Sequence, residues 1–247
     1  MLAGAAQAAD LPVAPGQAYY PGVVTPVPYY DWGGVYLGLN AGGAWVAQSQ
    51  GIITNAPTGA FVSSSASSGS SGFAGGGQIG ANWFFAPSFL LGVEADFDAL
   101  TNTTTNTALD GSNRHDGKLK FLSTARGRFG LTADRLLFYL TGGLAWGENS
   151  VTRTQIAGPP VNNATPGTVE TINNFRVGWV AGTGVEYAFL NNWTARVEYL
   201  YSRLDGVTYT FPLAQRTTQT PFEAINLIRV GVNYKFGGGD PYIRARD

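Results

Sequence analysis

The sequence contains no cysteine, and only one histidine, His115, among its 247 residues. Without cysteine the chain can form no disulfide bond, no thiolate metal site and no cysteine nucleophile. One histidine cannot supply a histidine-rich cluster, so we expect neither a metal nor a cofactor. Charged residues make up 13% of the chain and the net charge is −1. Because no strong field of either sign results, nucleic acid is not an expected partner.

Long apolar runs and helical periodicity are also missing. No stretch approaches the ~20 apolar residues that a membrane helix needs. Eight segments instead alternate with period two, which is typical of β-strands. They are residues 33–46, 73–85, 89–99, 118–131, 136–147, 175–189, 193–204 and 223–236. Every proline lies outside them, as expected if each strand uses its backbone donors.

Short and long connections alternate between these segments. The short ones are residues 86–88, 132–135 and 190–192, and the long ones are 47–72, 101–117, 148–174 and 205–222. The long connections are polar and exceed ordinary hairpin loops. This alternation predicts an up-and-down antiparallel meander whose two ends differ. If the protein lies in a membrane, the long loops are expected on the exterior.

The two faces of the expected strands have opposite character. One face carries the charges, namely Glu94, Asp96, Asp98, Lys120, Arg126, Arg128, Arg176, Glu186, Arg196, Glu198, Arg229 and Lys235. The other carries aromatic pairs eight residues apart: Phe89 and Phe97, Phe121 and Phe129, Phe138 and Trp146, Trp179 and Tyr187, Trp193 and Tyr201. Eight residues on a tilted strand span about 20 Å, near the ~25 Å apolar band of an outer-membrane barrel. A lipocalin has the reverse polarity, so the aromatic face is predicted to contact lipid.

The charged face is therefore predicted to line the interior of an eight-stranded barrel. Closure of 223–236 on 33–46 would remove the sheet edges, which lipid cannot hydrate. An interior of this size holds side chains but no wide channel. Buried charges there must be paired. Neighbouring strands are expected to place Glu94 and Asp96 beside Arg126 and Arg128. The same reasoning places Glu186 beside Arg196.

Two terminal motifs then carry a family resemblance. DWGGVYLGLNAGGAW (31–45) and VGVNYKF (230–236) resemble the small alphaproteobacterial outer-membrane β-barrel proteins, a porin-like family related to the OmpA/OmpX transmembrane fold. The resemblance implies a bacterial outer-membrane location and a structural or adhesive role without enzymatic activity. It also implies that Tyr234 and Phe236 form the signal read by the barrel-assembly machinery. Such proteins usually end at that aromatic residue, whereas residues 237–247 continue here.

The remaining segments complete the expected domain organisation. Ala6-Gln7-Ala8 matches a signal-peptidase site, so residues 1–8 are interpreted as a residual signal-peptide tail. Residues 9–31 contain five prolines and suit an extended periplasmic spacer. Residues 32–236 form the barrel, and 237–247 a C-terminal tail.

Three motifs could indicate a functional site, but a structural explanation is favoured for each. GGGQIG (75–80) has the spacing of a dinucleotide-binding loop, but it lies within an expected strand and no helix follows. His115 lies in a long polar loop without a nucleophile or second base beside it. Asp96 and Asp98 share one strand face, where ion pairing to neighbouring arginines explains them better than acid–base catalysis.

Two functions remain after this reasoning, with a third well behind them. The first is a non-enzymatic outer-membrane barrel that supports the envelope and contacts host or surface ligands through its loops. The second is a narrow porin that passes small solutes. The third is an outer-membrane enzyme. Outer-membrane lipid, lipopolysaccharide and the barrel-assembly machinery are the expected partners.

Overall fold

The computed structural model describes residues 30–47, 50–66, 69–107, 113–157, 162–220 and 222–236. The predictions for residues 1–8, for 237–247 and for nearly all of the 9–31 spacer lie outside these ranges. Within the described part, all regular elements are β-strands. No helix there is long and apolar enough to cross a membrane.

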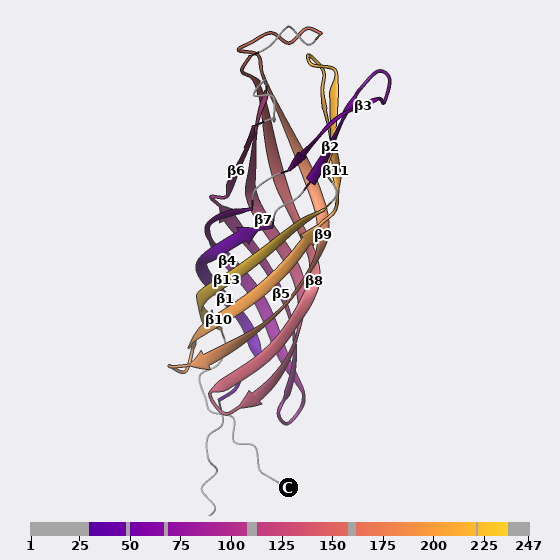
Figure 1. Cartoon of the computed structure of the whole chain (residues 1–247). Coiled ribbons are helices and arrows are strands. Elements are labelled where there is room, and N and C mark those ends of the chain that lie inside the picture. The colour runs from indigo at the N-terminus through magenta and orange to yellow at the C-terminus, as the bar shows by residue number, and fades with distance from the viewer. Residues whose placement is uncertain are drawn as a thin grey trace, which may run out of the picture.

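Eight long strands form a closed antiparallel ring (Figure 1). They are β1 (Gly34–Val46), β4 (Ser70–Ala86), β5 (Phe89–Leu100), β7 (Asn113–Ala133), β8 (Leu136–Gln155), β9 (Val169–Ala188), β10 (Trp193–Leu204) and β13 (Glu223–Lys235). Pairing of β5 with β7 completes the ring, and β1 pairs with β13 along its length. The predicted eight-stranded barrel and its closure of the last strand on the first are confirmed.

Alternating side chains explain why these segments form a barrel wall. Along β5, buried and exposed residues alternate strictly. Leu39 and Leu140 point outward and are 73% and 62% exposed, whereas Leu90 and Arg229 point inward and are 0% and 1% exposed. A wall with apolar residues outside and charged residues inside suits lipid around the barrel.

The short turns all lie at one end of the barrel. β4 and β5 are joined by Pro87 and Ser88, and β7 and β8 by Asp134 and Arg135. Asp134 has φ 51°, a left-handed conformation that is common in tight hairpin turns and that Asp tolerates. The amide of Lys235 donates to the carbonyl of Asn192, so the end of the last strand also lies there.

The opposite end contains more ordered structure than the sequence predicted. β7, β8 and β9 extend well beyond 118–131, 136–147 and 175–189. Their extensions carry mostly polar residues, so no apolar alternation marked them. The long connections also contain five short strands: β2 (Gln50–Asn55), β3 (Phe61–Ala66), β6 (Thr103–Thr107), β11 (Val207–Phe211) and β12 (Arg216–Thr220).

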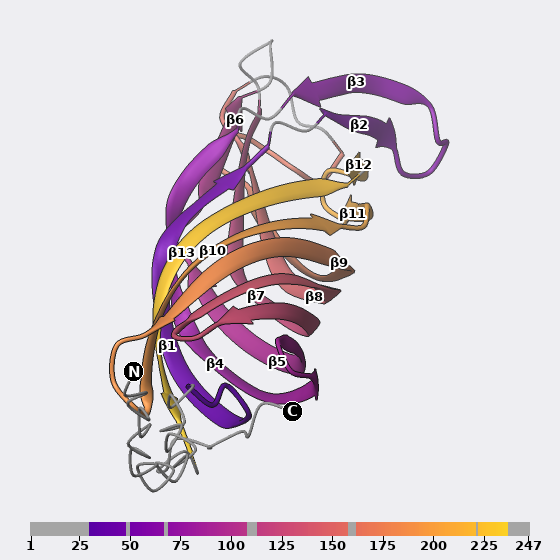
Figure 2. The same ribbon diagram turned by 90° about the horizontal axis from the view of Figure 1, so that it is seen from below.

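Two of the long connections fold together into a second sheet. Its strand order is β11-β12-β2-β3, which joins residues 50–66 to residues 207–220 (Figure 2). Tyr209 and Phe211 are 2% and 0% exposed on its inner face, packed with Ala164 and Ala214. The outer face carries uncharged residues in register, with Thr208 opposite Gln219 and Gln219 opposite Ile52. This apolar cluster also packs against Val151 on β8 and Ile172 on β9, which holds the loop sheet against the barrel extensions.

A β-bulge changes the expected orientation of one stretch. The pairing of β7 with β8 shifts register between Leu119 and Phe121. One extra residue in a strand reverses the face of those beyond it. Leu119 has the strand parity of Phe121 and was therefore expected to face lipid, but it is 3% exposed and packs in the interior. The prediction that Lys120 faces the lumen is also wrong, because the bulge places it at the rim.

Charge on the outer wall should destabilise the barrel according to depth. Val93 and Leu140 are outward-facing and 53% and 62% exposed. Because arginine at mid-bilayer is poorly solvated, Val93→Arg or Leu140→Arg should lower the free energy of unfolding by ~2–4 kcal/mol. Thr103→Arg, in the outer connection, should change it by less than ~1 kcal/mol. Urea unfolding in lipid vesicles measures all three, and equal losses would contradict the assigned lipid face.

Candidate functional site

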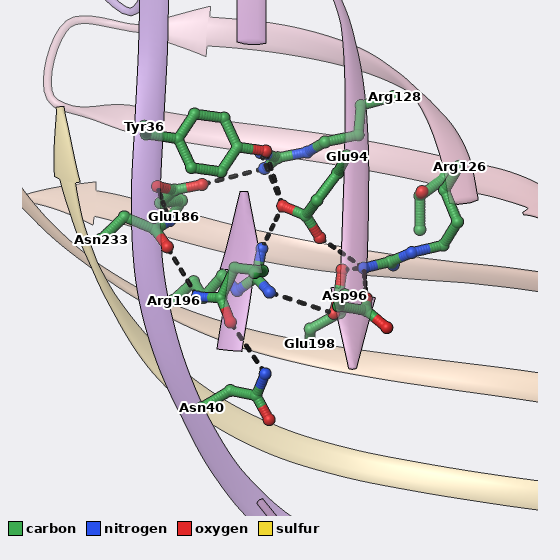
Figure 3. Close-up of polar contacts among 12 residues, drawn as sticks. Tyr36, Asn40, Glu94, Asp96, Arg126, Arg128, Glu186, Arg196, Glu198 and Asn233 are labelled. Atoms are coloured by element: carbon green, nitrogen blue, oxygen red, sulfur yellow. Dashed lines mark hydrogen bonds and ion pairs between the residues drawn. The ribbon is translucent and has the colours of Figure 1, made fainter. Parts of the chain in front are cut away.

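The candidate site is a layer of charged side chains across the barrel interior (Figure 3). It consists of Arg126, Arg128, Arg196 and Arg229 with Glu94, Asp96, Asp98, Glu186 and Glu198. None of these side chains is more than 4% exposed. We call this set the ionic layer.

Arg126 connects three carboxylates. Its guanidinium pairs with Glu94 on the adjacent strand β5 and lies 2.6 Å from Asp96 Oδ2. Its other terminal nitrogen lies 2.9 Å from Glu198 Oε1, on β10 across the lumen. Arg126 therefore joins strands that are not neighbours in the sheet.

Arg229 on β13 repeats this arrangement from another side. Its terminal nitrogens lie 2.7 Å from Asp96 Oδ2 and 2.5 Å from Asp98 Oδ2. It also lies 2.8 Å from Glu198 Oε2. Arg196 Nη1 binds Glu94 at 2.5 Å. Because Glu94, Asp96 and Glu198 each face more than one guanidinium, the burial cost of these charges is offset by several partners.

Arg128 is held by aromatic rings as well as by acids. It donates to the hydroxyl of Tyr36 at 2.6 Å, and that hydroxyl donates to Glu94 at 2.6 Å. Its guanidinium carbon lies 3.9 Å from the centre of the Tyr139 ring, a cation–π contact. The Tyr139 hydroxyl donates to Glu198 at 3.1 Å. Arg128 Nη2 lies 2.9 Å from Glu186.

Two glycines make room for these tyrosines. A Cβ at Gly80 would lie 2.3 Å from the Tyr36 hydroxyl oxygen, and one at Gly184 would lie 2.4 Å from that of Tyr139. Any side chain there would displace a ring that supports the ionic layer. Gly80 belongs to the GGGQIG segment, which lies within β4, so packing accounts for this glycine.

One expected pair has a different geometry. Glu186 and Arg196 are directly opposite on β9 and β10, as predicted. Glu186 nevertheless binds Arg128 across the lumen, together with Thr194 and Asn233. Arg196 reaches over to Glu94 instead. The lumen is narrow enough for a guanidinium to span it, so pairing is not limited to adjacent strands.

Three of the predicted lumen residues lie outside the ionic layer. Lys120 is at the outer rim, where its Nζ lies 2.6 Å from Glu148 and its side chain is 39% exposed. Arg176 is in the outer mouth and lies 2.6 Å from Glu223. Lys235 is at the turn end, where its ammonium donates to the Asp31 carbonyl.

Apolar side chains close the interior on both sides of the ionic layer. Toward the loops lie Leu122, Leu200, Leu227 and their neighbours, all buried. Toward the turns lie Trp32, Leu90 and their neighbours, also buried. The Trp32 indole donates to the Asp134 carbonyl, which fixes it in the mouth. The ionic layer is thus enclosed between two apolar layers, and this enclosure was not predicted.

Four other polar residues of the site could have been assigned to the interior from their strand parity. Tyr36, Tyr139, Gln78 and Asn233 face the interior and join the network. Each has the same strand parity as the inward glycines or charges of its strand. Their polar atoms explain the inward position. The inner leucines share this parity as well, but parity does not show that they form closed apolar layers.

The chemistry of this site is that of ion pairing. Each of the five carboxylates binds at least one arginine. Among the described residues, no group of three His, Cys, Asp or Glu side chains could hold a metal ion. The arrangement can fill and rigidify the barrel interior.

The aromatic residues of the outer wall fall into two groups along the barrel axis. Register places Phe89, Phe129, Phe138, Tyr187 and Trp193 near the turns, and Phe97, Phe121, Trp146, Trp179 and Tyr201 near the loops. Rings within a group touch, as in the stacked pairs Phe89–Phe129 and Phe97–Phe121. At the turn end, the Tyr234 ring packs edge-on against both Trp193 and Phe236.

His115 lies outside the membrane-spanning wall, beneath the loop sheet. Its ring packs edge-on against Phe211 with centroids 5.8 Å apart. It is directly opposite Arg153 on β8, and Arg153 pairs with Glu170. Burial and the Arg153 charge lower the pKa of His115 to about 4, although Asp116 acts in the opposite direction.

We predict that acid weakens the docking of the loop sheet. A freed His115 would bind a proton near pH 6.5, whereas docked His115 binds one only near pH 4. Docking is therefore strongest above pH 6.5 and weakens as the pH falls from there toward 4. Hydrogen exchange of 207–211 should rise over this range, and less so in His115→Phe, which keeps a ring. NMR titration of this single histidine near 6.5 would contradict the buried position.

Removing one arginine from the ionic layer should be costly. Arg126→Met leaves three carboxylates underpaired in a dry interior, so the free energy of unfolding should fall by ~3–5 kcal/mol. The double variant Arg126→Met, Asp96→Asn should lose less than the single one, because it removes charge of both signs. Lys120→Met, which breaks an exposed pair, should cost less than ~1 kcal/mol. Urea titration of the refolded barrel compares them, and similar losses for Arg126→Met and Lys120→Met would contradict a dry layer.

Comparison with known proteins agrees with this architecture. A family model described as an outer membrane protein beta-barrel domain matches residues 1–236. The 31 kDa outer-membrane immunogenic protein of Brucella melitensis is 33% identical over 246 residues, covering 96% of this chain and 95% of that protein. The 25 kDa outer-membrane immunogenic protein of Brucella canis is 29% identical over 222 residues, covering 87% and 84%.

A solved structure supports the fold at greater distance. The outer membrane protease OmpT of Escherichia coli has a TM-score of 0.51 at 10% identity, covering 82% of this chain and 97% of that one. At that identity the likeness concerns the fold alone. The family match and the Brucella relatives place the protein in the bacterial outer membrane. The chain belongs to the outer membrane protein β-barrel family.

Proposed function

We propose that this protein is a non-enzymatic outer-membrane barrel that supports the envelope and displays its loops to the surroundings. The observation that carries the proposal is the enclosed ionic layer. Nine charged side chains bridge the lumen, and apolar layers lie above and below them. An ion crossing this interior would have to displace bound guanidinium groups, which favours a plug over a pore.

The narrow porin is the alternative, and the strand number argues against it. Diffusion porins of ~16 strands leave an aqueous channel, whereas eight strands leave room for side chains. In a porin the lumen charges would be bathed in water, but Arg126 and Glu198 have side chains that are 0% exposed. The enzyme alternative has less support, because the likeness to a protease is one of fold.

The proposed partners are assigned to the lipid-facing wall and to the two ends of the barrel. Outer-membrane lipid and lipopolysaccharide would contact the aromatic wall. Tyr234 and Phe236 would be read by the barrel-assembly machinery; they lie exposed at the end of β13. Host or surface ligands would meet the loop sheet, whose outer face includes Thr208, Gln219 and Ile52. The Brucella relatives are named as immunogenic, which suits a displayed surface.

Planar-bilayer conductance tests the plug directly. The refolded wild-type protein should give no steady conductance under conditions in which a 16-stranded porin conducts. Removing the Arg196–Glu94 bridge by Arg196→Ala with Glu94→Ala should raise the frequency of transient openings, because two interior side chains are lost. A steady, ion-selective conductance from the wild type would support the porin and overturn the plug.

A further inference from the structure

Arg203 is a cation on the lipid-facing wall at the loop end of the barrel. It follows Tyr201 by two residues on β10, so both side chains point outward. Tyr201 and Trp179 form part of the outer aromatic group, with ring centroids 5.5 Å apart. Arg203 is exposed and directly opposite Trp179 in the sheet. One further step along a tilted strand, about 5 Å, places it just outside the apolar band.

The guanidinium of Arg203 is fixed by an aromatic ring. Its central carbon lies 3.7 Å from the ring centre of Phe222. This stacking orients the plane of the guanidinium and leaves its N–H edges free to donate. Phe222 is 41% exposed and immediately precedes β13, so the ring is anchored next to the wall.

Arg203 differs from three other arginines at the loop end of the barrel in having no acid. Arg114, Arg153 and Arg176 bind Asp116, Glu170 and Glu223 respectively. Within the described residues, no carboxylate lies within ion-pair distance of Arg203, although Asp205 is two residues away. A cation that is oriented but not neutralised has its charge available to an outside anion.

The depth of Arg203 specifies which anion it meets. Arginine at the end of an apolar wall extends its head into the headgroup region. With the loops outside, that region belongs to the outer leaflet, whose lipopolysaccharide carries phosphate on its lipid portion. A guanidinium edge binds phosphate through two parallel hydrogen bonds. We propose that Arg203, oriented by Phe222, binds a lipopolysaccharide phosphate at the outer rim of the barrel.

This assignment rests on the proposed outward orientation of the loops, and it is independent of whether the lumen conducts. Lys118 provides a matched control, because it is an exposed cation above Phe121 on β7. It has the same charge as Arg203 but no aromatic ring contact among the described residues. A purely diffuse attraction to anionic lipid would treat the two cations alike.

Binding of purified lipid A to the refolded full chain in detergent tests the site. Phosphorylated lipid A should bind ~10-fold more tightly than lipid A from which the phosphates have been removed. Arg203→Ala should remove most of that preference, whereas Lys118→Ala should change it less than ~2-fold. Arg203→Lys should retain part of it, because a lysine keeps the charge without the planar fork. Phe222→Leu should weaken it while leaving the charge in place.

Three results would overturn the proposal. Equal binding of the two forms of lipid A would show that phosphate is not recognised. Equal losses in Arg203→Ala and Lys118→Ala would show diffuse charge attraction. Competition by phosphatidylglycerol as strong as that by phosphorylated lipid A would reject lipopolysaccharide as the specific ligand. Urea unfolding of each variant in the absence of lipid A separates loss of the fold from loss of binding.

Discussion

The barrel depends on neutralising charge in a space without water. An isolated ion costs several kcal/mol in such an interior, so each must be surrounded by partners of opposite sign. Here the partners come from β5, β7, β9, β10 and β13, which lie on different sides of the lumen. A shift of one residue in any of these strands would turn its charges toward lipid. The ionic layer therefore determines the pairing register of these strands as well as filling the lumen.

The other inner residues support this layer from above and below. Tyr36 and Tyr139 place hydroxyl groups and ring faces where carboxylates and Arg128 need them. Gly80 and Gly184 supply the space that the rings occupy. The apolar layers exclude water from the ionic layer that lies between them. The lower dielectric strengthens every interaction between its charges. The outward side chains of the same strands form an uncharged surface toward lipid. Arg203 lies beyond the aromatic group at the loop end of this surface.

Strand parity explains which parts of this structure could be read from the sequence. Charges of one parity and aromatic residues of the other predicted the eight strands, their closure and the lipid-facing side. Parity gives the direction of a side chain but no distance across a lumen, so the bridge from Arg196 to Glu94 could not be derived. The bulge at Lys120 adds a residue without any sequence mark, and the face of Leu119 was assigned wrongly for that reason.

The loop sheet and the apolar layers escaped prediction for a different physical cause. β2 and β12 are short and polar, and they pair with each other only because the closed barrel brings their loops together. Leu122 and Leu200 have the strand parity of the charged residues, but parity does not show that such residues gather into layers that close the lumen. Both features come from tertiary structure, which local patterns of residues do not encode.

The position of the acids along the chain has a consequence for how the barrel assembles. Glu94, Asp96 and Asp98 all lie on β5, whereas Arg196 and Arg229 are about 100 to 130 residues later. A half-built sheet would hold these acids without half of their counter-ions, so they would have to keep water around them until Arg196 and Arg229 arrive. Insertion and closure must then be one cooperative step with few stable intermediates. The ionic layer can therefore form only late in assembly, because the interior can lose its water only after the last strand has paired.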